Sequence, residues 1–241
     1  MTTGGTNMRR YSLLLAPALL LACAGCQIIP MNADSSAALK EAPVIQVVRY
    51  HSGPINITNP KDAPGLGPLS VVVVGSVAGS GELPTGDALA RVFKLPDPGD
   101  EVARRLVEKL KAEGRLGNLR LEPNPLPRPL PEDASQYRAR YPSGLVLELS
   151  IDTQGASYAP TNWRTYTYYM AGRARLIRVS DGKVLWLDTC NIHAFADDAA
   201  KRQLDVSEFE ANNGAKLKEI TSYSNERCSR ILADKILAKA S

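Results

Sequence analysis

Two long segments of alternating residues, Arg164–Arg178 and Lys183–Phe195, constrain the fold of this chain more than any other feature. The turn Ser180–Gly182 lies between them, and an Asp-Gly pair in that position is a strong signal of a β-hairpin. In the first segment, alternate positions from Tyr166 to Leu176 are mostly apolar, and the intervening positions carry Thr and Arg. We therefore expect a sheet around this hairpin with one face buried.

Other segments are predicted to extend the sheet and to cover it. Apolar or alternating runs predict strands at Val44–Tyr50, Ile55–Thr58, Leu69–Gly75, Leu116–Leu121 and Gly144–Asp152. Helical patterns predict helices at Asp87–Lys94, Glu101–Glu113 with Asp100 as its N-cap, Glu132–Arg140, and 208–240 with a break at Asn212–Gly214. This order predicts an α+β fold with a single mixed sheet, in which a βαβ unit precedes a three-strand antiparallel meander. Helices, including a C-terminal helix, pack on the sheet.

The N-terminus has the pattern of a secretory signal peptide. Arg9 and Arg10 precede an apolar stretch of 12 residues, Tyr11–Ala22, which is too short to span a bilayer. Met8 stands directly before the two arginines, so translation starts at either Met1 or Met8. We predict that residues 1–22 are removed.

The end of this stretch, Leu20-Leu21-Ala22-Cys23, resembles the lipobox of bacterial lipoproteins. In that family the cysteine thiol takes a diacylglycerol, the leader is cut before it, and the new amine is acylated. The resemblance implies lipidation at Cys23, with Cys26 after Ala24-Gly25 as the alternative. The residue that follows either cysteine is not Asp, which by resemblance to enteric lipoproteins implies the periplasmic face of the outer membrane. A plain secreted protein with two incidental cysteines is the other interpretation.

Composition is consistent with a globular body behind this anchor. Residues 23–43 contain small and polar residues and prolines and are predicted to be the lipid anchor and a flexible tether, and residues 44–241 a single periplasmic domain. Without the leader, the 29 Lys and Arg residues less Arg9 and Arg10 stand against 25 Asp and Glu. A chain so close to neutral gives little support to nucleic-acid binding, and we expect none.

Cys190 and Cys228 are predicted to form a disulfide, because an exported chain meets an oxidising compartment. A two-residue turn would place Cys190 opposite Arg173 on the polar face. A three-residue turn with Gly182 in a bulge would place it opposite Gly172 on the apolar face, and would also pair Leu176 with Trp186. We favour the second register; two buried free thiols are the alternative.

Catalytic patterns are weak in this sequence. The glycines of Val71–Gly81 follow a predicted strand, but Pro84 follows too closely for a helix that would bind a nucleotide, so no cofactor is expected. The two histidines, His51 and His193, show no metal-ligand spacing. We therefore predict no catalytic and no metal site. Arg173 and Arg175, with Tyr169, are candidates for contacting an acidic partner, or belong to a solvated face.

The segments GLVLELSID and RARLIRVSDGKVLW resemble small envelope lipoproteins, among them the curli-secretion lipoprotein and the N-terminal domain of the Tol β-propeller protein. The resemblance rests on turn and packing residues: Asp181, Gly182, Lys183, Leu185 and Trp186. It implies the architecture and carries over no catalytic residue. The predicted function is a non-enzymatic binding or assembly module with an envelope protein partner. The alternatives are an oligomeric export accessory, or an envelope hydrolase with a site near His51 or His193.

Overall fold

The computed structural model describes residues 28–58, 86–113, 116, 118–128, 134–159, 162–193 and 198–238. The predicted lipidation site, the predicted strand Leu69–Gly75 and the glycines of Val71–Gly81 lie outside these residues. No helix among the described residues is both long and apolar enough to cross a membrane.

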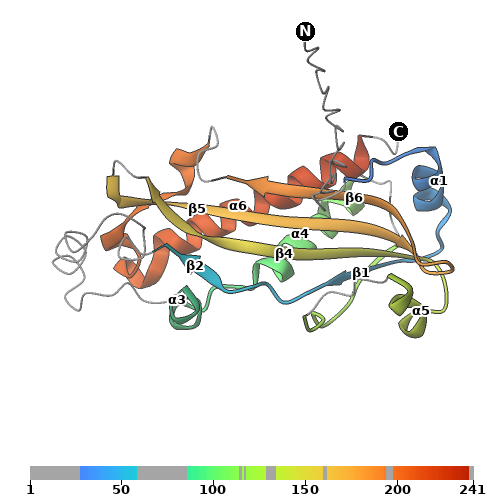
Figure 1. Ribbon diagram of the computed structural model, residues 1–241, viewed down its shortest axis with the longest axis horizontal. Coiled ribbons are helices and arrows are strands. Elements are labelled where there is room, and N and C mark those ends of the chain that lie inside the picture. Colours follow the sequence, from blue (N-terminus) through green and yellow to red (C-terminus); the bar gives the residue numbers. More distant parts are fainter. Residues whose placement is uncertain are drawn as a thin grey trace, which may run out of the picture.

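Seven strands form one mixed sheet, which confirms the predicted α+β class (Figure 1). The strands are β1 (Ile45–Arg49), β2 (Ile55–Ile57), β3 (Leu119–Leu121), β4 (Leu145–Ala159), β5 (Asn162–Arg178), β6 (Lys183–Ile192) and β7 (Gln203–Asp205). The order is β3-β1-β4-β5-β6, with β2 beside the far part of β4 and β7 beside the start of β5. The strand β1 pairs in parallel with β3 and β4, whereas β4, β5 and β6 form the predicted antiparallel meander.

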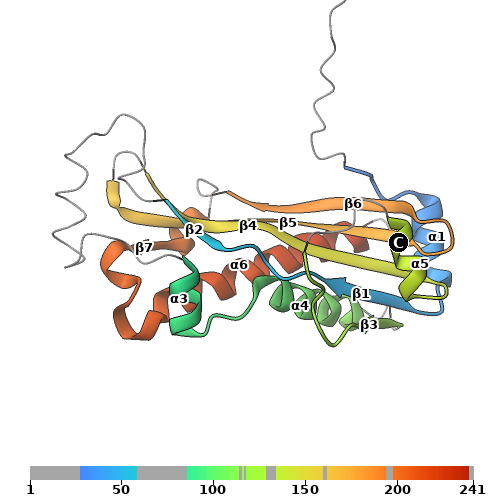
Figure 2. The ribbon, with the colours of Figure 1, turned by 60° about the horizontal axis from the view of Figure 1, so that its bottom comes forward.

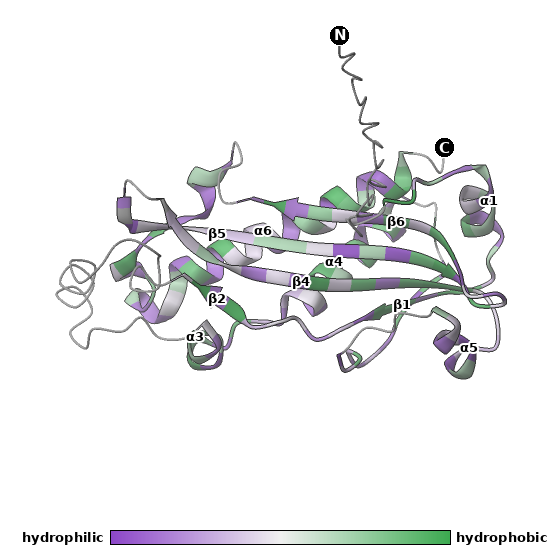
Figure 3. Cartoon of the chain, in the orientation of Figure 1, coloured by the Kyte–Doolittle hydropathy of each residue, from purple (hydrophilic) through white to green (hydrophobic). Residues whose placement is uncertain are grey.

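Four of the described helices cover one face of this sheet: α1 (Ala33–Glu41), α3 (Gly86–Phe93), α4 (Pro98–Ala112) and α6 (Ala211–Leu237). The short helix α5 (Tyr137–Arg140) lies on the opposite face. Figure 2 shows α4 and α6 stacked beneath the sheet, with α4 forming the crossover between the parallel strands β1 and β3. The main core lies between these two helices and the apolar face, and the alternation of hydropathy along β4 and β5 is visible in Figure 3.

The opposite face of the sheet is covered at one end by α5 and the short 3-10 turn Ala134–Gln136. A second, smaller core forms there from Val48, Ala134, Tyr137, Tyr141, Val146, Ile177 and Val179. Among the described residues, this end of the long strands therefore has a buried core on both faces.

The segment predicted as a tether is, from Ile28 onward, part of the folded body. Ile29 exchanges two backbone hydrogen bonds with Leu187 at the outer edge of β6, of 3.0 and 2.9 Å. Asn32 caps α1 in a capping box, and Met31 and Leu39 are buried in the main core. The prediction was wrong because α1 has few apolar residues that would mark it in the sequence. The helix is held in place by the buried Leu39, by its neighbour Met31, and by a 2.7 Å hydrogen bond from the buried Ser35 hydroxyl to the Leu185 carbonyl.

The structure also moves several predicted boundaries. The N-cap of α4 is Asp97 rather than Asp100, because Pro98 is favoured in the first helical turn. The strand β4 continues to Ala159 through a bulge after Ile151, whereas the sequence pattern predicts an end at Asp152. In α6, three residues with positive φ, Asn212, Asn213 and Gly214, form the predicted break. The strand β7 was not predicted.

The hairpin adopts the favoured register, but not by the expected turn. Gly172 pairs with Cys190 and Leu176 with Trp186, and Cys190 is bonded to Cys228 with the two Cα atoms 5.3 Å apart. Four residues lie in the turn between Arg178 and Lys183. The register shift falls between the pair Leu176–Trp186 and the pair Ile177–Val184. Gly182 has a φ of 71° in the turn, and Leu185 rather than Gly182 is the additional residue in the ladder.

Candidate functional site

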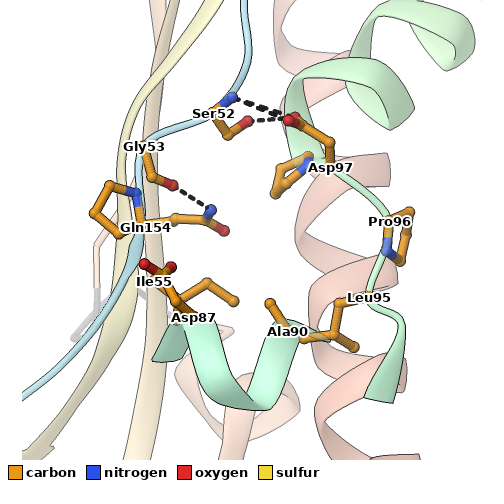
Figure 4. Close-up of a pocket in the computed structure, with 11 residues that line it drawn as sticks. Ser52, Gly53, Ile55, Asp87, Ala90, Leu95, Pro96, Asp97 and Gln154 are labelled. Atoms are coloured by element: carbon orange, nitrogen blue, oxygen red, sulfur yellow. Dashed lines mark hydrogen bonds between the residues drawn. The ribbon is translucent and has the colours of Figure 1, made fainter. Parts of the chain in front are cut away.

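A pocket of about 430 Å³ opens where β1 ends, between β2, α3 and the start of α4 (Figure 4). Three walls meet there: the turn that leads from β1 into β2, the linker between α3 and α4, and one residue of β4. The lining residues are Ser52, Gly53, Pro54, Ile55, Asp87, Ala90, Leu95, Pro96, Asp97, Pro98 and Gln154. The volume is within the range of small-ligand sites.

Asp97 is held rigidly at the wall formed by the start of α4. Its carboxylate accepts hydrogen bonds from the Ser52 hydroxyl at 2.6 Å, the Ser52 amide at 3.1 Å and the Gly99 amide at 2.8 Å. Burial alone would raise the pKa of Asp97, but these hydrogen bonds outweigh burial and lower it below its usual value. Asp97 is therefore a negatively charged group in this wall at neutral pH.

Gln154 fixes the opposite wall. Its amide nitrogen donates to the Gly53 carbonyl at 2.9 Å, and its amide oxygen accepts from the Tyr168 hydroxyl at 2.8 Å. The Gln154 side chain is buried with only 3% exposure, so both ends of the amide are committed to protein partners. This wall links the turn after β1 to β4 and β5, and we expect it to keep its shape when a ligand enters.

The charge of the pocket is negative. Asp87, at the start of α3, is exposed and adds a second carboxylate to that of Asp97. Among the described residues that line the pocket there is no Lys or Arg, and most of the remaining surface is apolar, including three prolines. Such a surface suits a cationic group attached to an apolar stem, as in a Lys or Arg side chain.

His51, one of the two predicted candidate histidines, lies next to this pocket. Its ring Nδ1 is 3.4 Å from Asp97 Oδ2, and 61% of the side chain is exposed. The neighbouring Ser52 hydroxyl donates to Asp97 and accepts from the Gly99 amide at 2.8 Å. Ser52 thus completes the cap of α4, and its proton goes to the carboxylate directly rather than to an imidazole as in a Ser-His-Asp triad.

His193 lies on a different element, directly after β6. Its side chain is exposed, and its carbonyl accepts a hydrogen bond of 2.8 Å from Arg202. The structure therefore places the two histidines apart along the fold, and only His51 contributes to the pocket region. The described residues contain no group of three His, Cys, Asp or Glu that could hold a metal ion.

Arg175, a predicted contact for an acidic partner, is buried inside the second core. It forms an ion pair with Glu148, and Glu148 also accepts a 2.6 Å hydrogen bond from the Tyr137 hydroxyl. Arg175 is thus committed to the protein interior, which corrects that prediction. Arg173 lies further along the same face, half-exposed, 3.6 Å from Asp152.

Sequence reasoning missed this pocket because its polar residues come from distant segments. Asp97 lies at the start of a helix and Ser52 in a turn, and neither position stands out in the sequence as part of a site. Gln154 lay beyond the predicted end of its strand. The one usable signal was the Asp-Pro-Gly-Asp sequence at 97–100, because Pro is favoured at the first position of a helix and Asp directly before it as the N-cap.

No known protein family and no curated protein matches the sequence. The solved structures that are similar to this chain at a low level include the following three. The PelC dodecamer from Paraburkholderia phytofirmans is 13% identical over 82% of this chain and 90% of that chain, with a TM-score of 0.35. Protein XCC0632 from Xanthomonas campestris is 12% identical over 88% and 92%, with a TM-score of 0.42. Lipoprotein GNA1162 from Neisseria meningitidis is 17% identical over 76% and 96%, with a TM-score of 0.20.

Proposed function

We propose that this chain is a lipid-anchored protein of the outer membrane whose periplasmic body is a non-enzymatic binding module. The anchor is the lipidated Cys23, or Cys26 in its place. The partner is an envelope protein that inserts a Lys or Arg side chain into the pocket beside α3 and α4. The observation that carries this proposal is the pocket itself, because it combines two carboxylates with apolar walls.

The rigidity of the pocket supports binding rather than chemistry. Ser52 and Asp97 are held by the cap of α4, and both ends of the Gln154 amide are hydrogen-bonded. A preformed site loses little conformational entropy when a partner binds. A cationic side chain that enters it meets Asp97 at one wall and Asp87 at the rim, and its stem contacts the proline-rich surface.

The anchor is tested by intact-mass analysis of the protein extracted from membranes, alongside Cys23→Ser and Cys26→Ser variants. A mature chain that begins at Cys23 and carries a diacylglycerol and an acyl group is the expected result. An unacylated chain cleaved elsewhere would refute the lipid anchor.

The binding module is tested by photo-crosslinking in intact cells, with a photoreactive residue in place of Ala90 at the pocket wall. We expect a defined crosslinked adduct that is lost when Asp87→Lys is added. Asp34→Lys is the matched control, because Asp34 is an exposed acid in the first turn of α1, away from the pocket. Loss of the adduct in both variants, or in neither, would count against a charge-selective pocket.

An envelope hydrolase is the second candidate, favoured by the position of His51 beside Asp97. Here the imidazole would act as a general base at the pocket mouth. His51→Ala decides between the two: full retention of the cellular phenotype removes the hydrolase, whereas loss of phenotype with an unchanged Ala90 crosslink supports it.

A further inference from the structure

A second hollow, of about 450 Å³, lies toward the other end of the molecule from the pocket at α3. It is formed by the first described residues, the middle of β6 and the last turns of α6. Its lining is Ile28, Pro30, Met31, Trp186, Asp188, Asp234, Lys235 and Ala238, and we call it the anchor groove.

The anchor groove exposes apolar side chains to solvent. Ile28 is 56% exposed, and among the described residues only Val92 is a comparably exposed large apolar side chain. Pro30 and Ala238 are exposed beside it, and Trp186 forms the floor. A single exposed Ile needs no explanation, but Ile28 shares one hollow with the exposed Pro30 and Ala238, and such a cluster of exposed apolar residues indicates a contact surface.

The chain that leads to the proposed lipid is short. Cys26 precedes Ile28 by two positions and Cys23 by five. A fully extended chain advances about 3.6 Å per residue, so the lipidated residue lies within about 7 or 18 Å of Ile28. Ile29 is fixed to β6 by its two hydrogen bonds to Leu187, and Met31 is buried, so the start of the body cannot swing away from the anchor.

The charges around the anchor groove are nearly balanced. Lys235 donates to Asp188 at 2.5 Å and to the Thr189 carbonyl at 2.8 Å. Of the charged residues that line the groove, Lys235 and Asp188 therefore neutralise each other, and Asp234 adds one negative charge. Electrostatic attraction to anionic headgroups therefore does not bring this surface to a membrane. The interactions available for membrane contact are the apolar lining and the short link to the proposed lipid.

We propose that the anchor groove is the surface of the body that lies against the bilayer, with Ile28, Pro30 and Ala238 in contact with lipid. This inference rests on the proposed lipid anchor and adds the orientation of the body. Figure 1 shows α1 and the hairpin end of β6 at one end of the long sheet, and α3 and β2 toward the other. The acidic pocket is then presented away from the membrane contact, where a periplasmic partner reaches it.

The test uses the lipidated full-length protein reconstituted in phosphatidylcholine vesicles with brominated acyl chains, which quench nearby tryptophan. Ala238→Trp places a reporter on the rim of the anchor groove, and Val92→Trp is the matched control, since both positions are exposed. The emission of the wild type, with its two native tryptophans, is subtracted from each. We expect loss of the added emission for Ala238→Trp and full emission for Val92→Trp.

Intact-mass analysis of the same samples separates the two proposals. A chain without lipid that stays off the vesicles would refute the anchor itself. A lipidated, vesicle-bound chain whose added emission is unquenched at position 238, or equally quenched at both positions, would overturn the orientation alone. Unquenched emission at position 238 is also the result expected if a second copy of the chain occupies the groove.

Discussion

Arg175 and Glu148 are direct partners across β4 and β5 and form a bidentate ion pair in the second core. Arg175 Nε lies 2.7 Å from Glu148 Oε1, and Nη2 lies 2.6 Å from Oε2. The residues are 8% and 1% exposed, and Tyr137 adds a hydroxyl that is itself bonded to the Tyr50 hydroxyl at 2.8 Å. Burial and the neighbouring carboxylate raise the pKa of Tyr137, so its hydroxyl remains a donor. The ion pair thus links β4, β5, α5 and the end of β1.

Glu148→Gln is expected to lower the free energy of unfolding by about 3–5 kcal/mol, because it leaves the Arg175 charge buried without a counter-ion. Urea denaturation at neutral pH measures the change. Glu108→Gln is the matched control: its partner Arg104 and Glu108 itself are 51% and 60% exposed, and such pairs contribute at most about 1 kcal/mol. Equal losses in the two variants would contradict the role given to the buried pair.

Reduction of the Cys190–Cys228 disulfide is expected to cost about 3–4 kcal/mol of stability. The bond closes a loop with a sequence separation of 38, and chain entropy makes the unfolded state more favourable once that loop is opened. Denaturation with and without reductant measures the loss, with thiol counting to confirm reduction. The Cys190→Ala, Cys228→Ala double variant should show the lower stability and no response to reductant. An unchanged midpoint in fully reduced wild type would rule out this contribution.

Gly172→Ala is expected to destabilise the protein by about 1–3 kcal/mol. A Cβ at this position would lie 2.7 Å from Ile151 Cδ1, 2.9 Å from the Ser150 carbonyl oxygen and 3.3 Å from Cys190 Sγ. The side chain of Ile151 can rotate away, but the Ser150 backbone would have to shift. Ser150 is paired with Arg173 of β5, so this shift would disturb the pairing of β4 with β5. Thermal unfolding tests this. Ala171→Ser, at the half-exposed neighbouring position, should change stability by less than about 0.5 kcal/mol, and a similar loss there would point to a general weakness of β5.

The hairpin was predictable because alternation and the Asp-Gly turn mark both of its strands. Of the two registers that the turn allowed, the one that places Cys190 on the apolar face, opposite Gly172, is the one observed. The meander and the crossover helix followed from alternation and amphipathicity in the same way. The helix α1 and the pocket did not follow, for a different reason. The position of α1 depends on Leu39 and Met31 meeting a core built from distant strands. The pocket depends on Ser52, Asp97 and Gln154, which are brought together only by the folded sheet.

Ser52→Ala tests the cap of α4 through its pH dependence. The pKa of Asp97 is lowered in the folded protein from its ordinary value of 3.8, because the hydrogen bonds from Ser52 and Gly99 outweigh burial. A carboxylate with a lowered folded-state pKa adds stability above its unfolded pKa, and this contribution is lost as the pH falls through the folded-state pKa. Removing the Ser52 hydroxyl should lower stability by about 1 kcal/mol at neutral pH, and the difference from wild type should shrink below pH 3.8.

Urea denaturation at a series of pH values from neutral to about pH 2 measures this difference. Asp97→Asn provides the control, because the amide cannot ionise: adding Ser52→Ala to it should give a stability change that is independent of pH in this range. If Ser52→Ala costs the same at every pH in the wild-type background, the hydroxyl acts only through packing and the hydrogen bond that it accepts from the Gly99 amide, and the carboxylate at the pocket wall is not held in its charged form by Ser52.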